Sequence, residues 1–159
     1  DAIEASARSI YTASHQIMKG LRPQTLDSAG LAEALRELLT SWSARNPAVQ
    51  IRLRLPEWRD TLSDEVHIQL FRVAQECLAN VAGHARARRV RVFLGRVRNA
   101  GADLVRLVVR DDGIGLDTEA PHGGLGLILM RERAHSLAGG FNLTSQPGHG
   151  TRVAVSVPI

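Results

Sequence analysis

Two pairs of predicted strands, each joined by only a few residues, most constrain what this chain can fold into. Residues 89–97 alternate apolar and polar side chains, and after a turn at 99–102 a further strand is expected over 103–111, with Leu104, Leu107 and Val109 among its apolar residues. Residues 141–145 and 151–157 flank a second turn, which contains Pro147 and two glycines. A parallel connection needs a crossover of a dozen or more residues, so neither pair can be joined as parallel neighbours. We therefore expect a mixed or antiparallel sheet.

Helical periodicity elsewhere in the chain predicts a second layer. A half-buried strand is expected over 49–55, between a helix that Asp27 or Ser28 caps and a long helix that Ser63 caps. Apolar residues recur at helical spacing in four segments: 2–20, 28–46, 63–85 and 125–138. These elements predict an α+β fold, a two-layer sandwich with helices packed on one face of a mixed β-sheet, preceded by one leading helix.

The composition is that of one ordinary globular domain with a modest extension. The chain has 159 residues, of which 44% are hydrophobic, so it can bury a core without disulfides. Its single cysteine, Cys77, lies in an apolar helical stretch and is expected to be a small buried side chain. The chain begins inside a predicted helix and without a methionine, so we expect a fragment of a longer protein.

The net charge of +4 comes almost wholly from arginine, because Lys19 is the only lysine. This balance fits a solvated arginine-rich surface, and it fits phosphate ligands equally well. No basic stripe interleaved with aromatic residues is visible in the sequence, so direct binding of nucleic acid is not expected.

Three polar residues of the long helix recur at a spacing of four. Glu76, Asn80 and His84 are therefore expected along nearly one line beside the apolar face. An amide and a carboxylate oxygen suit a hydrated Mg²⁺, and His84 can donate to a phosphate oxygen. The alternative is a partly buried polar stripe whose hydrogen bonds are satisfied within the protein.

Asp111 ends an apolar strand and begins a glycine-rich loop. Gly113 and Gly115 allow a tight turn and the close approach of a ligand. A carboxylate at this place can accept a hydrogen bond from an amino group such as that of adenine. An ordinary Asp-Gly turn after a strand is the alternative interpretation.

Two further glycine segments follow. Residues 123–127 (GGLGL) open a predicted helix, where free backbone N–H groups can bind phosphates. No Lys-Ser or Lys-Thr follows them, so they do not form a P-loop. Residues 148–151 (GHGT) can be a simple hairpin turn, or Thr151 can hydrogen-bond a base or a bridging water. For residues 123–127, the alternative interpretation is a flexible loop before a helix.

Taken together, four segments resemble the ATP-binding domain shared by bacterial sensor histidine kinases, DNA gyrase, the 90-kDa heat-shock chaperone and the MutL mismatch-repair proteins. QECLANVAGHA (75–85) resembles the N-box, and DDGIGLD, GGLGL and GHGT resemble the three glycine boxes. LRPQTLDSAGLAEAL (21–35) and GLGLILMRERAHSLAGG (124–140) are similar to the sensor kinases that serve LuxR-type response regulators, among them the nitrate, sugar-phosphate and membrane-fluidity sensors.

The resemblance implies a role for each matching position. Asn80 would coordinate Mg²⁺, Glu76 would polarise the acceptor nucleophile, and His84 would approach a phosphate. Asp111 would bind the adenine amino group. The remaining positions would line the nucleotide or hinge a lid over roughly 116–123, and they are Gly113, Gly115, Gly124, Leu125, Gly126, Leu127 and Thr151. Gly83 departs from the pattern, since these kinases often carry Lys or Arg there, and this puts the strength of phosphate binding in doubt.

The same resemblance implies the organisation and activity of the parent protein. Residues 1–22 would be the second helix of a dimerisation and phosphotransfer hairpin, and residues 23–159 the ATP-binding catalytic domain. With ATP and Mg²⁺, the domain would phosphorylate a histidine that this fragment lacks, and the phosphoryl group would pass to an aspartate of a LuxR-type response regulator. His15 is poorly placed to be that histidine, so the fragment is not expected to be competent alone.

The parent is expected to be a homodimer whose catalytic domain is cytoplasmic, and anchoring of the parent in the inner membrane stays open. The alternative function is a nucleotide-gated interaction module that transfers nothing. An anti-sigma-type serine kinase shares the glycine boxes, but the Leu-Arg-Pro segment (21–23) and the leading helix argue against it.

Overall fold

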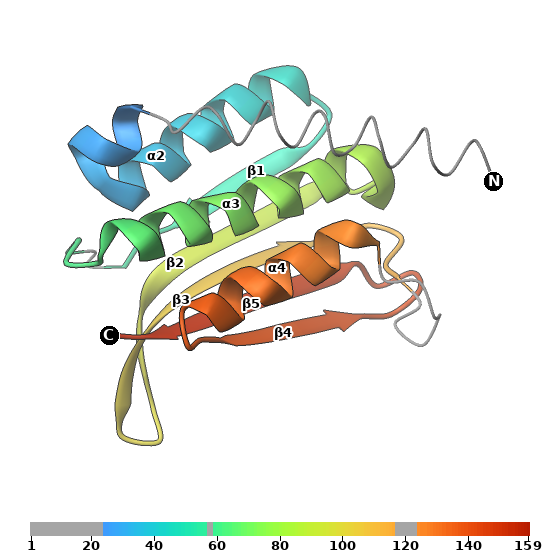
Figure 1. Ribbon diagram of the computed structural model, residues 1–159. Coiled ribbons are helices and arrows are strands. Elements are labelled where there is room, and N and C mark those ends of the chain that lie inside the picture. The colour runs from blue at the N-terminus through green and yellow to red at the C-terminus, as the bar shows by residue number, and fades with distance from the viewer. Residues whose placement is uncertain (1–23, 57–58, 117–123) are drawn as a thin grey trace, which may run out of the picture.

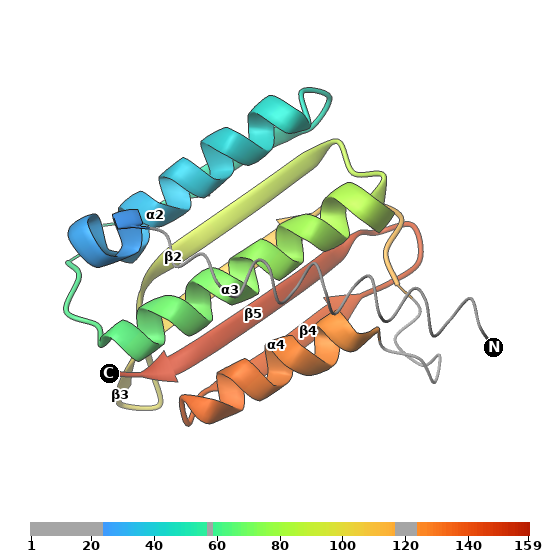
Figure 2. The ribbon, with the colours of Figure 1, turned by 45° about the horizontal axis from the view of Figure 1, so that its top comes forward.

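The computed structural model describes residues 24–56, 59–116 and 124–159. Within these residues three α-helices cover one face of a five-stranded sheet, and the other face carries no helix (Figure 1, Figure 2). This arrangement confirms the predicted α+β sandwich. The elements in chain order are α2 (Gln24–Arg45), β1 (Gln50–Arg54), α3 (Asp64–Asn80), the π-helical turn η1 (Val81–Ala85), β2 (Arg89–Asn99), β3 (Ala102–Asp111), α4 (Leu125–Ser136), β4 (Gly140–Ser145) and β5 (Thr151–Pro158).

The sheet is mixed, with the strand order β1-β2-β3-β5-β4. Strands β2 and β3 pair antiparallel, as do β4 and β5, so both predicted hairpins are confirmed. Strand β1 is parallel to β2, and α3 supplies the crossover that a parallel pair requires. The sheet therefore places the C-terminal end of β3 beside the start of β5, and the glycine loops lie at this end of the strands.

The core lies between the helices and the sheet. Alternate residues of the central strands point into it, and Leu94, Val105 and Val155 are fully buried there. Leu70 and Leu78 of α3 pack against them from the helical layer. Branched aliphatic side chains thus fill a core to which the 4% aromatic content contributes little. Cys77 is buried in the same cluster, as expected.

Helix α2 differs from the prediction at its start. It begins at Gln24 rather than at a cap on Asp27 or Ser28, and Gly30 interrupts it with a φ of 78°. The segment beyond this break is capped from outside the helix, because the Leu31 backbone N–H donates to the Asp60 carboxylate at 2.9 Å. A distant residue therefore supplies a cap that local sequence cannot reveal.

The long helix predicted over 63–85 is not regular throughout. Ser63 caps its start as predicted, accepting from the Val66 backbone N–H at 3.4 Å. The α-helix ends at Asn80, and η1 continues it as a wider π-helical turn. The Ala85 carbonyl at the end of this turn accepts from the Ile114 backbone N–H at 2.8 Å, so the first glycine loop fixes how the helix ends.

The predicted leading helix over 2–20, with His15, lies outside the described residues, as do residues 117–123 of the predicted lid. None of the described helices combines the length and the apolar character needed to cross a membrane.

Candidate functional site

Helix α3 holds two of the predicted site residues at the inner side of the helical layer. Glu76 is only 6% exposed, although it is a carboxylate, and Asn80 is half-buried at the last position of the helix. Both follow from the helical spacing of four that the sequence showed. A buried carboxylate needs hydrogen bonds or a neighbouring cation to offset the cost of burial, so the role of Glu76 depends on the groups around it.

Arginine from α4 supplies positive charge beside Glu76. Burial lowers the pKa of the Arg133 guanidinium, and the nearby Glu76 carboxylate opposes this shift. Arg133 Nη1 also donates to Gln69 Oε1 of α3 at 2.7 Å. Burial likewise lowers the pKa of Arg72, and repulsion from Arg133 adds to this. Helices α3 and α4 lie side by side (Figure 2), so these groups form one polar cluster between them.

Arg131, on the same helix as Arg133, points away from this cluster. The Arg131 guanidinium lies over the Phe141 ring, 5.7 Å from its centroid, on the side of α4 that faces β4.

Asp111 ends β3 with its side chain turned into the molecule, and it is 7% exposed. Its Oδ1 accepts a hydrogen bond from the Gly113 backbone N–H at 2.8 Å. Burial raises the pKa of the Asp111 carboxyl, while hydrogen bonding to the Gly113 and Thr151 backbones opposes the rise. Asp111 thus presents an acceptor inside the protein, as a base-binding carboxylate must.

The Asp111 loop is in contact with the end of the N-box. A Cβ added to Gly113 would clash with the Ala85 backbone, so only glycine fits at this crossing. Ile114 continues the contact through its hydrogen bond to Ala85, and its own carbonyl accepts from the Gly148 N–H at 2.6 Å.

The third glycine box closes on the same strand end. A Cβ on Gly150 would clash with the Asp111 carbonyl, and one on Gly115 would clash with the Gln146 carbonyl. Both glycines also have positive φ, at 75° and 70°. The structure thus brings together three segments that are distant in sequence: the end of the N-box, the first glycine box and the third.

Ser145 is a site residue that the sequence analysis missed. Its Oγ accepts from the Leu116 N–H at 2.7 Å, donates to the Gly150 carbonyl at 2.9 Å and lies 2.9 Å from Thr151 Oγ1. One hydroxyl therefore ties the first glycine box to the third and orients Thr151. The only signal in the sequence is a polar residue at an inward-facing position of a strand, next to a turn.

The start of α4 carries the second glycine box. Gly124 is the N-cap residue but offers no side-chain cap, so the first backbone N–H groups of the helix depend on other acceptors. Gly126 is buried, Leu125 is 45% exposed, and Leu127 packs against the core. This is the donor arrangement that binds phosphates at helix starts.

His84 and Gly83 lie in η1 on the wall of a cavity of about 560 Å³, which Asn46 and Ile114 also line. The His84 side chain is exposed and makes no hydrogen bond or ion pair with another described residue. A Cβ added to Gly83 would meet nothing within 4 Å. A longer side chain at Gly83 therefore has room.

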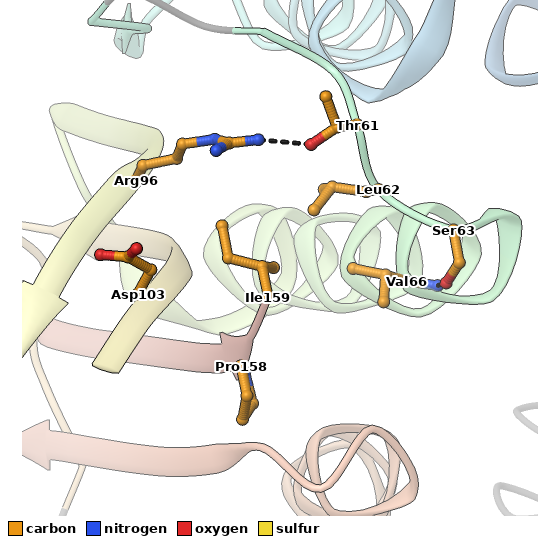
Figure 3. Close-up of a pocket in the computed structure, with 8 residues that line it drawn as sticks. All are labelled: Thr61, Leu62, Ser63, Val66, Arg96, Asp103, Pro158 and Ile159. Carbon is orange, nitrogen blue, oxygen red and sulfur yellow. Dashed lines mark hydrogen bonds between the residues drawn. The ribbon is translucent and has the colours of Figure 1, made fainter. Parts of the chain in front are cut away.

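A second cavity lies at the other end of β3, and it contains none of the predicted site residues. Its volume is about 270 Å³, and Asp103, Val66 and Ile159 are among its lining residues (Figure 3). The Arg96 guanidinium donates to the Thr61 hydroxyl across its mouth (Figure 3). Since Asp103 lies near the start of β3 and Asp111 ends it, this cavity is separate from the glycine loops.

Comparisons with known proteins agree with this geometry. Residues 65–159 match the family described as histidine kinase-, DNA gyrase B- and HSP90-like ATPase. The signal transduction histidine-protein kinase/phosphatase UhpB of Salmonella typhimurium is 37% identical over 159 residues, covering 98% of this chain and 30% of the relative. The sensor histidine kinase LiaS of Bacillus subtilis is 39% identical over 143 residues, covering 87% of this chain and 37% of the relative. The chain thus spans about a third of the length of these relatives.

Solved structures show the same fold. The histidine kinase domain of a blue-light activated histidine kinase from Erythrobacter litoralis superposes with a TM-score of 0.66 at 23% identity, over 85% of this chain and 68% of that one. The family match shows that this chain belongs to the histidine kinase-, DNA gyrase B- and HSP90-like ATPase family, and the sequence relatives that it resembles over 87–98% of its length are sensor histidine kinases.

Proposed function

We propose that this domain binds ATP with Mg²⁺ and presents the γ-phosphate to a histidine of its own phosphoacceptor hairpin. The observation that carries the proposal is the buried Asp111 carboxylate, held by Gly113 and enclosed by two glycine loops that leave no room for side chains. The Gly113 and Thr151 backbones hold the carboxylate in place, and its remaining lone pairs would accept from the adenine amino group. Thr151, which Ser145 orients, lies beside it as the second base contact.

Asn80 and Glu76 are proposed to serve the phosphate end. The donor set fits Mg²⁺, which prefers oxygen ligands and keeps several waters, so that one amide oxygen suffices beside the phosphate oxygens. The ion, when bound, neutralises charge on the transferring phosphoryl group. Glu76, near Arg133, would polarise the attacking imidazole, and the backbone N–H groups of Gly124, Leu125 and Gly126 at the start of α4 would bind phosphate oxygens.

Within the parent protein, the phosphorylated histidine would pass its phosphoryl group to an aspartate of a LuxR-type response regulator, and the parent would act as a homodimer. Catalysis by the domain itself would consist mostly of positioning and charge neutralisation, as phosphoryl transfer requires. The likeness to named sensor histidine kinases over 87–98% of this chain supports this assignment.

The second candidate function is a nucleotide-gated module that binds ATP without transfer. It is favoured by Gly83, where the structure leaves open space and the residue itself carries no cation. A trans-phosphorylation assay separates the two functions: labelled ATP, this chain and the phosphoacceptor hairpin of its parent are mixed. Label on the hairpin supports the kinase. Nucleotide binding without label on the hairpin supports the module.

A further inference from the structure

The face of the sheet that no helix covers carries a row of four arginines. The helices lie on one side only (Figure 1, Figure 2), and the strands alternate, so each residue between two core residues points to the open side. Val90 and Val92 are buried in the core, for example, and Arg91 between them is exposed on the open face.

The strand register places the four arginines directly beside one another. Arg52 of β1 pairs with Arg91 of β2, Arg91 with Arg110 of β3, and Arg110 with Arg152 of β5. Neighbouring strands lie about 4.8 Å apart, so the row crosses roughly 14 Å of the sheet. We call these four residues the arginine row. They are far apart in the sequence, so only the register reveals the row.

No acidic side chain of the described strands neutralises the arginine row. The acidic residues of the strands are Asp103 and Asp111, and both lie on the face of the sheet that the helices cover. Asp112, just beyond β3, is occupied by Arg89, whose Nε lies 2.8 Å from Asp112 Oδ2. Among the described residues, no member of the arginine row has an ion-pair partner.

Like charges directly opposite each other destabilise a sheet. Four guanidinium groups in lateral register therefore oppose folding rather than support it. An anionic partner outside the molecule would offset this repulsion. Binding of such a partner therefore explains the arginine row, which the packing of the core does not explain.

The neighbouring row of the same face is largely apolar. Arg54 pairs with Phe93, Phe93 with Val108, and Val108 with Ala154. Phe93 and Val108 are partly exposed. The face therefore combines a line of positive charge with a shallow apolar strip.

We propose that this open face binds the surface of an anionic phospholipid bilayer. A bilayer presents phosphates at every lateral position, so the arginines need no matching pattern of acids on a partner, and each guanidinium can hold a phosphate through two hydrogen bonds. The apolar strip would face the boundary between headgroups and acyl chains. Single-stranded nucleic acid fits less well, because it stacks on several aromatic side chains and Phe93 is the only aromatic on the described part of this face.

Co-sedimentation of this chain with vesicles tests the proposal. Vesicles of phosphatidylcholine alone are compared with vesicles that also contain phosphatidylglycerol, for the unaltered chain and for the double variant Arg91→Gln/Arg110→Gln. The matched control is Arg36→Gln/Arg45→Gln, which removes the same charge from exposed positions of α2. We expect binding to the anionic vesicles only, weakened roughly thirtyfold in the first double variant and little changed in the control.

Arg91→Lys/Arg110→Lys keeps the charge but loses the two-bond contact, so its binding should lie between that of the unaltered chain and that of the glutamine variant. Thermal unfolding should show that no variant loses the fold. Equal binding to both vesicle types overturns the proposal, as does an equal loss in both double variants. Absence of vesicle binding overturns it too, and preference for a single-stranded oligonucleotide over the anionic vesicles would assign the face to nucleic acid. Titration of ATP into the same variants keeps this result separate from the nucleotide site.

Discussion

Asp111 Oδ1 accepts a hydrogen bond from the backbone N–H of Gly113 at 2.8 Å, two residues further along the chain. This bond turns the strand end into the loop and points the carboxylate inward. The loop then crosses the end of the N-box so closely that Gly113 has no space for a side chain. The position of the proposed base-binding acceptor and the close packing of the loop are thus parts of one local structure.

Gly113→Ala is expected to lower the free energy of unfolding by about 1–3 kcal/mol, because its methyl group would press on the Ala85 backbone. Gly83→Ala is the matched control, since its methyl group enters open space in a helical turn. It should be neutral or stabilising by up to about 1 kcal/mol. Urea unfolding of both variants measures the difference. Equal stability of the two variants would contradict the described crossing of the loop and the N-box.

Arg133→Met should destabilise the domain by about 1–3 kcal/mol, since it leaves Glu76 buried without its neighbouring cation and Gln69 without a donor. Arg131→Met is the control on the same helix. Its arginine is exposed and lies over Phe141, so the loss should stay below about 1 kcal/mol. If chemical denaturation gives the two variants the same stability, Arg133 does not support Glu76.

The pH dependence of folding stability tests the role of the Asp112 carboxylate. Partial burial acts to raise the pKa of its carboxyl, but hydrogen bonds from the Arg89 side chain and from the Arg89 and Arg88 backbones hold that pKa at about 2, below its usual 3.8. A lowered pKa in the folded state contributes stability that is present above pH 3.8 and is lost as the pH falls toward 2.

Asp112→Asn should therefore be less stable than the unaltered chain at pH 6, and the difference should shrink as the pH drops through this range. The effect should be modest, since Asp112 and Arg89 are partly exposed. Melting temperatures of both proteins from pH 6 to pH 2 measure it. A difference that stays constant across the range would show that Asp112 acts without its charge.

Gly83→Lys should strengthen the binding of ATP roughly fivefold, because the added ammonium can reach a phosphate from a position with free space. Binding of adenosine, which has no phosphate, is the control and should not change. Calorimetric titration with both ligands distinguishes the cases. Unchanged ATP affinity would show that Gly83 lies away from the phosphates and that this departure from the family pattern has no consequence for binding.

The sequence predicted the sheet hairpins and the N-box helix because alternation and helical spacing are local patterns. It also predicted close backbone approach at the glycine loops, which the packing of Gly113 and Gly115 confirms, while the role of Asp111 stays a prediction. It did not predict the cap that Asp60 supplies to Leu31, the π-helical turn before Ala85, or the linking role of Ser145. Each of these depends on a contact between residues distant in the chain, as does the arginine row, which exists only through strand register.

The most direct test of the nucleotide site is calorimetric titration of ATP with Mg²⁺ into this chain and into Asp111→Asn. The substitution keeps an oxygen that can accept from Gly113 but replaces the other acceptor with an NH₂ group. Asp103→Asn, at the other end of the same strand, is the matched control. We expect binding in the unaltered chain and the control, and a loss of at least about tenfold in Asp111→Asn. Equal affinity of all three proteins, or no binding by the unaltered chain, would contradict the assignment of this pocket.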